Sequence, residues 1–276
     1  MRRGRYLGPL AILMSVLVVG GLARAQRIDT RPPHLRNAGI DQRLNEQLPL
    51  DLRFRDESGN AVELRQYFGR KPVVLTFAYY ECPMLCTMVL NGLVKAMRAI
   101  SMDVGKEFEV INISINPREA PSLAASTKKT YVQEYGRSGA DSGWHFLTGD
   151  ESAIRRAAAA AGYRYGFDPV TGQFTHASGI MVLTPEGKFS RYFYGVEFSA
   201  RDLRLGLVEA AANKIGTPVD QVLLYCFHYD PVTGKYGLVI NNVIRVVGTG
   251  FALTLGALVL ILLRRERRLR PRASQL

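Results

Sequence analysis

Two cysteines four residues apart, Cys82 and Cys86, lie between an apolar run and a run with helical spacing. The apolar run covers 73–78 and is typical of a strand buried on both faces, while 86–101 has the pattern of a helix. Pro83 fits the first helical position, because a helix leaves that N–H without a partner. We therefore expect Cys82 to cap a helix that directly follows a strand, with Cys86 about one turn further on.

This corner of the fold would give the two sulfurs a specific chemistry. A helix N-terminus stabilises negative charge, so at least Cys82 should form a thiolate more readily than a free cysteine. Two sulfurs on one side of a helix can clamp a soft metal ion or cycle to a disulfide. The chain has only three cysteines, which excludes a scaffold held together by disulfides. We therefore expect these cysteines to serve chemistry.

The order of the predicted elements indicates an α/β fold with reactive residues at the carboxyl end of a strand. Residues 26–47 are polar and are expected to form an irregular extension, followed by one domain over 48–216. The phrase Asp-Pro-Val-Thr-Gly occurs at 168–172 and at 230–234, which we interpret as two similar turns. Strand patterns cover 52–54, 61–64, 73–78, 108–115, 144–147, 180–183 and 189–194, and helical patterns cover 86–101, 121–135, 151–161 and 199–215.

Both ends of the chain carry membrane-targeting patterns. Residues 1–25 combine an Arg-rich start, an apolar stretch and a final Ala-x-Ala, which predicts a signal peptide cleaved after Ala25 or, alternatively, an uncleaved signal anchor. Residues 246–263 carry no charge, and as a helix they would be about 27 Å long, enough to cross a bilayer core. We expect a transmembrane helix over 243–263 and a basic tail over 264–276.

The net charge of +12 is concentrated at these ends, because 1–25 hold four Arg and 264–276 hold six. Basic residues that flank an apolar span set its orientation, so the charge predicts topology and gives no support to nucleic-acid binding. We expect a single-pass protein of the bacterial inner membrane. Its functional domain would lie on the periplasmic side, and its C-terminus would lie in the cytoplasm.

The histidines offer further metal ligands. His176 precedes the predicted hairpin over 180–194, and its loop could return beside the end of the strand that leads to Cys82. Two thiolates and one imidazole suit Cu(I), although Zn(II) could also be held. The alternative is a loop histidine that only makes hydrogen bonds. His145 is expected in the core or on the surface, and His34 has no visible partner.

The run Cys-Pro-Met-Leu-Cys before a helix, with a His ahead of the hairpin Gly-x-Met-x-Leu-x-Pro-x-Gly at 179–187, resembles the SCO/SenC family over roughly residues 48–215. The resemblance implies a membrane-anchored thioredoxin-like domain, with a central mixed sheet flanked by helices. It also implies copper binding and a role in assembling the copper centre of a respiratory cytochrome c oxidase. Cys82, Cys86 and His176 match the family's copper ligands. The implied partner is the copper-bearing oxidase subunit or another copper chaperone.

The chain departs from this family in three places. The family usually has an acidic residue directly before the ligand histidine, whereas this chain has Thr175, and an imidazole without that partner could be oriented more loosely. The family's usual anchor is N-terminal, whereas here it is C-terminal. The connector over 217–242 lies outside the resemblance and contains Cys226 and His228. These two residues are predicted to form an auxiliary copper-holding pair, or alternatively a packed cysteine and an interfacial histidine.

Two functions follow from these patterns. The first is a copper chaperone that passes Cu(I) to a partner by ligand exchange. The second is a thiol-disulfide oxidoreductase that keeps the cysteines of a copper acceptor reduced, and the two can coexist because oxidation would abolish metal binding. A peroxide-scavenging enzyme has only a thiol at a helix start in its favour. A turnover enzyme is not predicted, since no nucleotide loop, paired catalytic carboxylates or Ser-His-Asp arrangement stands out.

Overall fold

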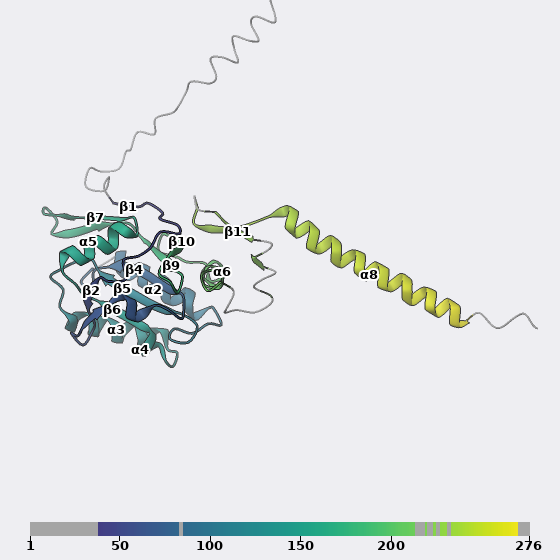
Figure 1. Ribbon diagram of the computed structural model, residues 1–276, viewed down its shortest axis with the longest axis horizontal. Helices are drawn as coiled ribbons and strands as arrows, with labels where there is room; N and C mark the ends of the chain where they lie inside the picture. The colour runs from purple at the N-terminus through teal and green to yellow at the C-terminus, as the bar shows by residue number, and fades with distance from the viewer. Residues whose placement is uncertain are drawn as a thin grey trace, which may run out of the picture. The chain divides into compact units, whose positions relative to one another are not determined.

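The computed structural model describes residues 38–82, 85–212, 219, 223–224, 227–230 and 233–269. Its centre is a five-stranded mixed sheet with the order β10-β9-β4-β5-β6 (Figure 1). The parallel strands are β4 (Val73–Ala78), β5 (Glu109–Ser114) and β6 (Trp144–Leu147). The antiparallel strands are β9 (Gly179–Leu183) and β10 (Phe189–Tyr194), and β10 forms the edge. The predicted mixed sheet flanked by helices is confirmed.

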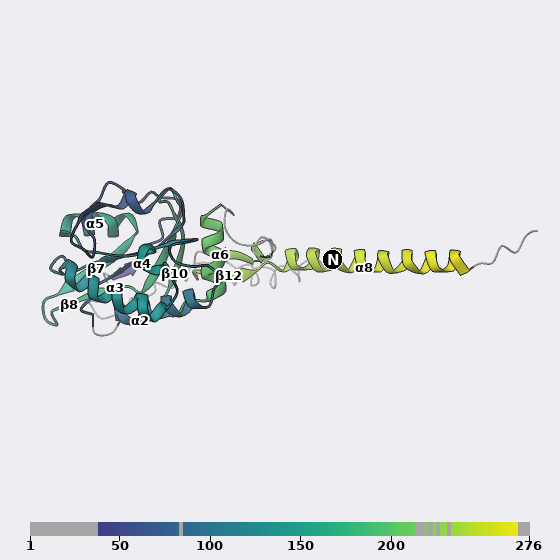
Figure 2. The same ribbon diagram turned by 90° about the horizontal axis from the view of Figure 1, so that it is seen from below.

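Helices cover both faces of this sheet. Successive side chains of a strand point to opposite faces, so one strand contributes residues to the core on each side. Val74 belongs to the core under helices α2 (Leu85–Arg98), α3 (Pro121–Tyr135) and α6 (Ala200–Ala210). Leu75 and Phe77 belong to the core under α5 (Glu151–Ala160). Figure 2 shows α5 on the opposite side of the fold from α2 and α3. All six residues of β4 are therefore buried, as expected for a central strand.

Smaller elements surround the sheet. The predicted hairpin is present as β2 (Arg53–Arg55) and β3 (Ala61–Glu63), followed by the 3₁₀ helix η2 (Leu64–Tyr67). Helix α4 (Ala140–Gly143) precedes β6. A separate three-stranded sheet contains β1 (Gly39–Ile40), β7 (Tyr163–Asp168) and β8 (Gln173–His176). The sequence patterns did not indicate this sheet, and its strand β1 lies within the segment predicted to be irregular.

The first copy of Asp-Pro-Val-Thr-Gly forms a hairpin turn, which confirms its interpretation as a turn, whereas residues 231–232 of the second copy lie outside the described residues. At 168–172, the Gly172 amide donates to the Asp168 carbonyl oxygen at 2.8 Å. At 230–234, the Gly234 amide donates to the Asp230 carbonyl oxygen at 2.9 Å. The first turn joins β7 to β8. The second joins β11 (Phe227–Asp230) to β12 (Lys235–Leu238).

The β11–β12 hairpin is bound to the edge of the central sheet. The Tyr229 hydroxyl accepts from the Tyr192 amide at 3.0 Å and donates to the Tyr192 carbonyl oxygen at 2.6 Å. The Arg191 guanidinium lies 4.8 Å from the centre of the Tyr229 ring and pairs with Glu209 of α6 at 2.7 Å. Tyr236 is also buried. The hairpin thus covers the exposed edge of β10, where unpaired backbone groups would otherwise remain.

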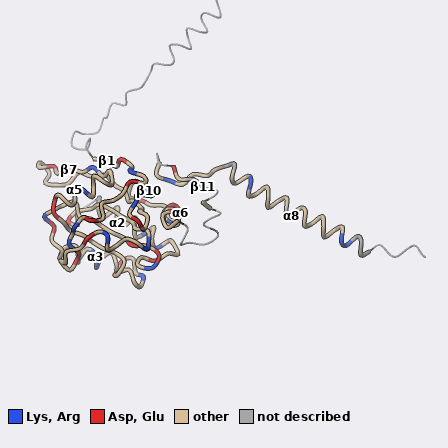
Figure 3. Tube along the Cα trace, in the orientation of Figure 1, with Lys and Arg blue, Asp and Glu red and all other residues tan. Residues whose placement is uncertain are grey.

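Helix α8 (Ile240–Leu269) follows β12 after a single residue, Val239. Its segment Asn242–Arg265 contains an 18-residue window with a mean hydropathy of 2.4, none of it buried, and is long and apolar enough to cross a membrane. Figure 3 shows basic residues only toward the two ends of α8. The predicted span over 243–263 lies within this helix. The predicted signal peptide lies outside the described residues, as does most of the basic tail.

Buried residues of the central strand β4 should contribute strongly to the free energy of unfolding. Leu75 is fully buried, so Leu75→Ala should lower the free energy of unfolding by about 2–5 kcal/mol. Val170→Ala, at a residue that is 92 % exposed, is the control and should change it by less than about 0.5 kcal/mol. Urea unfolding of the full chain in detergent can be followed by the fluorescence of Trp144, which is the only tryptophan and is buried. Equal midpoints for the two variants would contradict this account of the core.

Candidate metal centre

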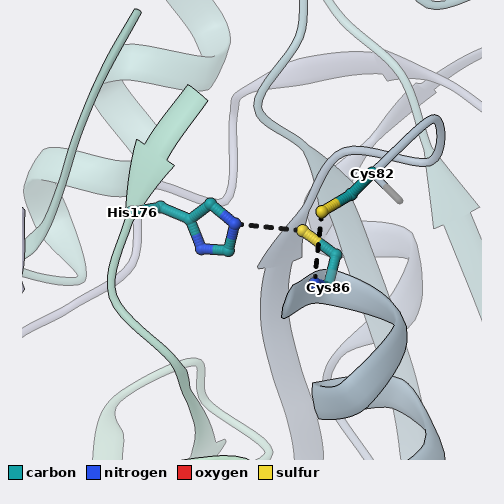
Figure 4. A group of neighbouring side chains, drawn as sticks. All are labelled: Cys82, Cys86 and His176. Atoms are coloured by element: carbon teal, nitrogen blue, oxygen red, sulfur yellow. Dashed lines mark hydrogen bonds between the residues drawn. The ribbon is translucent and has the colours of Figure 1, made fainter. Parts of the chain in front are cut away.

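The structure brings Cys82, Cys86 and His176 together. One possible ligand atom from each residue lies within 4.8 Å of the other two, and all three residues are buried. Figure 4 shows the imidazole pointing at the Cys86 sulfur, with Nε2 at 3.1 Å from Sγ. Donors bound to one ion at about 2.0–2.3 Å lie about 3.5–4 Å from each other. Small side-chain movements would therefore allow the three donors to share an ion.

Three different elements position these residues. Cys82 follows the carboxyl end of β4, and Cys86 lies in the first turn of α2. His176 is the last residue of β8 and pairs in register with Tyr165. His176 was expected in a loop but lies in a strand, because the turn at 168–172 folds β8 back along β7. Pro83, the expected first helical residue, lies outside the described residues.

Backbone amides point at both sulfurs. The Cys86 amide donates to Cys82 Sγ at 3.4 Å, and the Tyr79 amide donates to Cys86 Sγ at 3.4 Å. The contact with Cys82 and burial raise the pKa of the Cys86 thiol well above its usual range. Both effects favour the thiol over the thiolate. The lowered pKa expected for Cys82 stays a prediction.

The second nitrogen of the imidazole has partners of its own. Nδ1 of His176 lies 2.9 Å from the Tyr163 hydroxyl and 2.9 Å from the Ala177 carbonyl oxygen. The ring of Tyr79 approaches the imidazole edge-on, with 6.0 Å between ring centres. Thr175 donates its hydroxyl to the Gly166 carbonyl oxygen at 3.3 Å. The imidazole is therefore held by a tyrosine rather than by a carboxylate on the preceding residue.

Sequence reasoning missed two residues that support the centre. The buried Glu119 carboxylate accepts from the Glu81 amide at 3.0 Å and from the Ser114 hydroxyl at 2.6 Å, and burial raises its pKa. It thus ties the segment that carries Cys82 to the end of β5. Nothing in the sequence marks this glutamate. Tyr163 was also missed, although the alternating aromatic residues from 163 to 167 are a strand signal.

The other candidate residues lie elsewhere or outside the description. His145, expected in the core or on the surface, is in β6, with Nε2 at 3.6 Å from Glu109 and its ring centre 4.2 Å from that of Tyr67. The backbone of His228 pairs with Gly237 in the β11–β12 hairpin. Cys226 and His34 lie outside the described residues, so the auxiliary pair stays a prediction.

Comparison with known proteins gives one family and several similar solved structures. The SCO1/SenC family model matches residues 41–209. No curated protein matches the chain. A putative electron transfer protein from Aquifex aeolicus VF5 is 24 % identical, with a TM-score of 0.54 over 62 % of this chain and 96 % of its own, and shows the same fold.

Two further solved structures are less similar in shape. ScoI of Arabidopsis thaliana, with copper bound, is 22 % identical, with a TM-score of 0.47 over 58 % of this chain and 96 % of its own. ScoI of Bradyrhizobium japonicum, also with copper bound, is 25 % identical, with a TM-score of 0.43 over 59 % of this chain and 94 % of its own.

Proposed function

The chain belongs to the SCO1/SenC family, and from this membership we propose that it is a membrane-anchored copper chaperone. Cys82, Cys86 and His176 would hold one Cu(I) ion as cargo. The ion would then pass to the copper centre of a respiratory cytochrome c oxidase or to another copper chaperone. The observation that carries the proposal is the buried group of two sulfurs and one imidazole within 4.8 Å.

The donor set suits the cargo. Thiolate sulfur is a soft ligand that selects Cu(I), and imidazole binds copper as well. Structural zinc sites are closed by four ligands, whereas this cluster provides three. An incoming thiol of an acceptor could therefore enter the coordination sphere before a resident ligand leaves. Transfer by ligand exchange follows from such an incomplete sphere.

Helix α8 supports the anchoring part of the proposal. Phe251 is 69 % exposed and Leu253 is 70 % exposed, and an apolar helix of this length is stable in a bilayer rather than in water. The basic residues that follow at 264–272 would keep the C-terminus in the cytoplasm of a bacterium. The metal centre would then face the periplasm. The signal peptide over 1–25 and the domain over 48–216 complete this proposed organisation.

The proximity of Cys82 and Cys86 supports a second candidate function. Cys82 and Cys86 are not in a disulfide, and residues one helical turn apart can form one. The pair could transfer two electrons and two protons to a disulfide of the acceptor, becoming a disulfide itself while the acceptor regains two thiols. Such a reductase step would prepare the acceptor for copper, so the two functions can follow one another.

A direct test of the first function is a Cu(I) titration of the reduced full chain in detergent, against a chromophoric Cu(I) chelator. We expect one ion per chain. A chain that retains no copper but reduces a protein disulfide would support the oxidoreductase and refute the chaperone.

The auxiliary pair can be tested separately. Cys226→Ser should slow copper transfer to an acceptor by about tenfold, a cost typical of a residue that supports a metal site, without changing copper stoichiometry. The measurement is the rate of transfer from the loaded full chain to a copper-free oxidase copper domain. Ser199→Ala, which removes the cap of α6 far from this segment in sequence, is the control. An unchanged transfer rate in Cys226→Ser would remove the auxiliary role.

A further inference from the structure

Tyr163 is buried beside the histidine of the metal centre. It is 2 % exposed, and its ring stacks on Phe77 of β4 with 4.8 Å between ring centres. Its hydroxyl lies 2.9 Å from His176 Nδ1 and 2.8 Å from the Ala177 carbonyl oxygen. The ring and the hydroxyl are therefore both fixed.

The backbone delivers Tyr163 to this place through a constrained turn. Gly162 has a φ of +63°, a left-handed conformation that favours glycine. A Cβ at this position would lie 1.8 Å from the Asp41 carbonyl oxygen, so only glycine fits there. The turn at Gly162 thus connects α5 to β7, and Tyr163 is the first residue of β7.

The hydrogen-bond partners determine which imidazole nitrogen carries the proton. The Tyr163 hydroxyl donates its single proton to the Ala177 carbonyl oxygen at 2.8 Å, with the Phe77 carbonyl oxygen at 3.4 Å as a second, more distant acceptor, which leaves the phenol oxygen to accept from Nδ1–H. Ala177 O also lies 2.9 Å from Nδ1. The opposite arrangement, with a bare Nδ1, would set a lone pair against that oxygen. Nδ1 is therefore protonated, and the lone pair of Nε2 faces Cys86 Sγ at 3.1 Å.

We propose that Tyr163 is the positioning residue of the metal centre, which fixes the His176 tautomer and aims Nε2 at the two sulfurs. The inference rests on the proposed copper function and adds to it. Because Tyr163 touches the ligand and not the metal, it acts through His176. A neutral hydroxyl orients the ring without bringing a negative charge to a site that already has two sulfurs. The imidazole then remains a ligand that an acceptor can displace.

The test compares two matched substitutions in the full chain in detergent. Tyr163→Phe removes the hydroxyl and keeps the ring, whereas Tyr165→Phe makes the same change two residues along β7 and serves as the control. Cu(I) affinity should fall about tenfold in Tyr163→Phe, the lower end of the 10–100-fold cost of losing such a partner, because Ala177 O still accepts from Nδ1. It should stay unchanged in Tyr165→Phe.

The second measurement needs no copper. ¹⁵N NMR of histidine-labelled, copper-free wild type should show His176 as the Nδ1–H tautomer, and Tyr163→Phe should show a mixture of both tautomers. An Nε2–H tautomer in the wild type would overturn the inference, as would unchanged tautomer and affinity in Tyr163→Phe. If the wild type bound no Cu(I) while the tautomers behaved as expected, the copper function would fail and the positioning contact would stand.

Discussion

Cys86→Ser is expected to cause the largest loss of Cu(I) affinity. The Cys86 sulfur is the member of the cluster that contacts both the imidazole, at 3.1 Å, and the Tyr79 amide, at 3.4 Å. A serine oxygen is a hard donor that Cu(I) does not favour. Four-ligand zinc sites bind with about 10–16 kcal/mol, so one ligand contributes about 3 kcal/mol, and its loss should weaken binding by about 100-fold or more.

Competition with a Cu(I) chelator measures this loss. Thr87→Ser is the matched control, because Thr87 is the next residue of α2, is exposed, and bonds the Cys82 carbonyl oxygen through a hydroxyl that serine retains. Its affinity should equal that of the wild type. Binding by Cys86→Ser within threefold of the wild type would place the copper elsewhere in the chain.

The second large effect concerns the histidine. Loss of a residue that only supports a metal ligand costs about 10–100-fold in affinity. His176→Ala removes a ligand itself, so it should lower Cu(I) affinity by at least this much. The effect should be smaller than that of Cys86→Ser, since two sulfurs would remain. The same variant should keep almost all of its dithiol reductase activity, because His176 has no necessary part in exchange between the cysteines and a disulfide. Chelator competition measures the copper affinity, and an insulin reduction assay on the same preparation measures the reductase activity.

This pair of readouts separates the two candidate functions. Unchanged copper affinity in His176→Ala would show that the three-ligand site is wrong. His145→Ala is the control, because His145 lies in β6 beside Glu109 and Tyr67 rather than in the cluster. It should alter neither copper affinity nor reductase activity.

Local pattern was enough to predict the elements of the central sheet. The bounds 73–78, 121–135, 144–147 and 189–194 match β4, α3, β6 and β10, because continuous apolar runs and a proline at a helix start are strong local signals. Strand β7 was missed because its side chains are mostly half-buried or exposed. It pairs with β8 and also with β1, which lies more than one hundred residues earlier, and the pairing with β1 is a contact that no local pattern contains.

The metal centre was predictable only in part. The spacing of Cys82 and Cys86 indicated the sulfur pair, while His176 was selected by resemblance to a family. Their supports, Tyr163 and Glu119, act through contacts that exist only in the folded chain. Thr175 illustrates the difference: its sequence position predicted a loosely held imidazole, whereas the structure provides a tyrosine from the neighbouring strand.

The short connection between the β11–β12 hairpin and helix α8 limits where the protein can work. Val239 alone separates them and spans at most about 3.6 Å, while Tyr229 and Arg191 bind the hairpin to the α/β domain. In the proposed membrane-anchored chaperone, the domain would therefore have no long tether with which to search for an acceptor. The acceptor would have to present its own copper site close to the lipid surface.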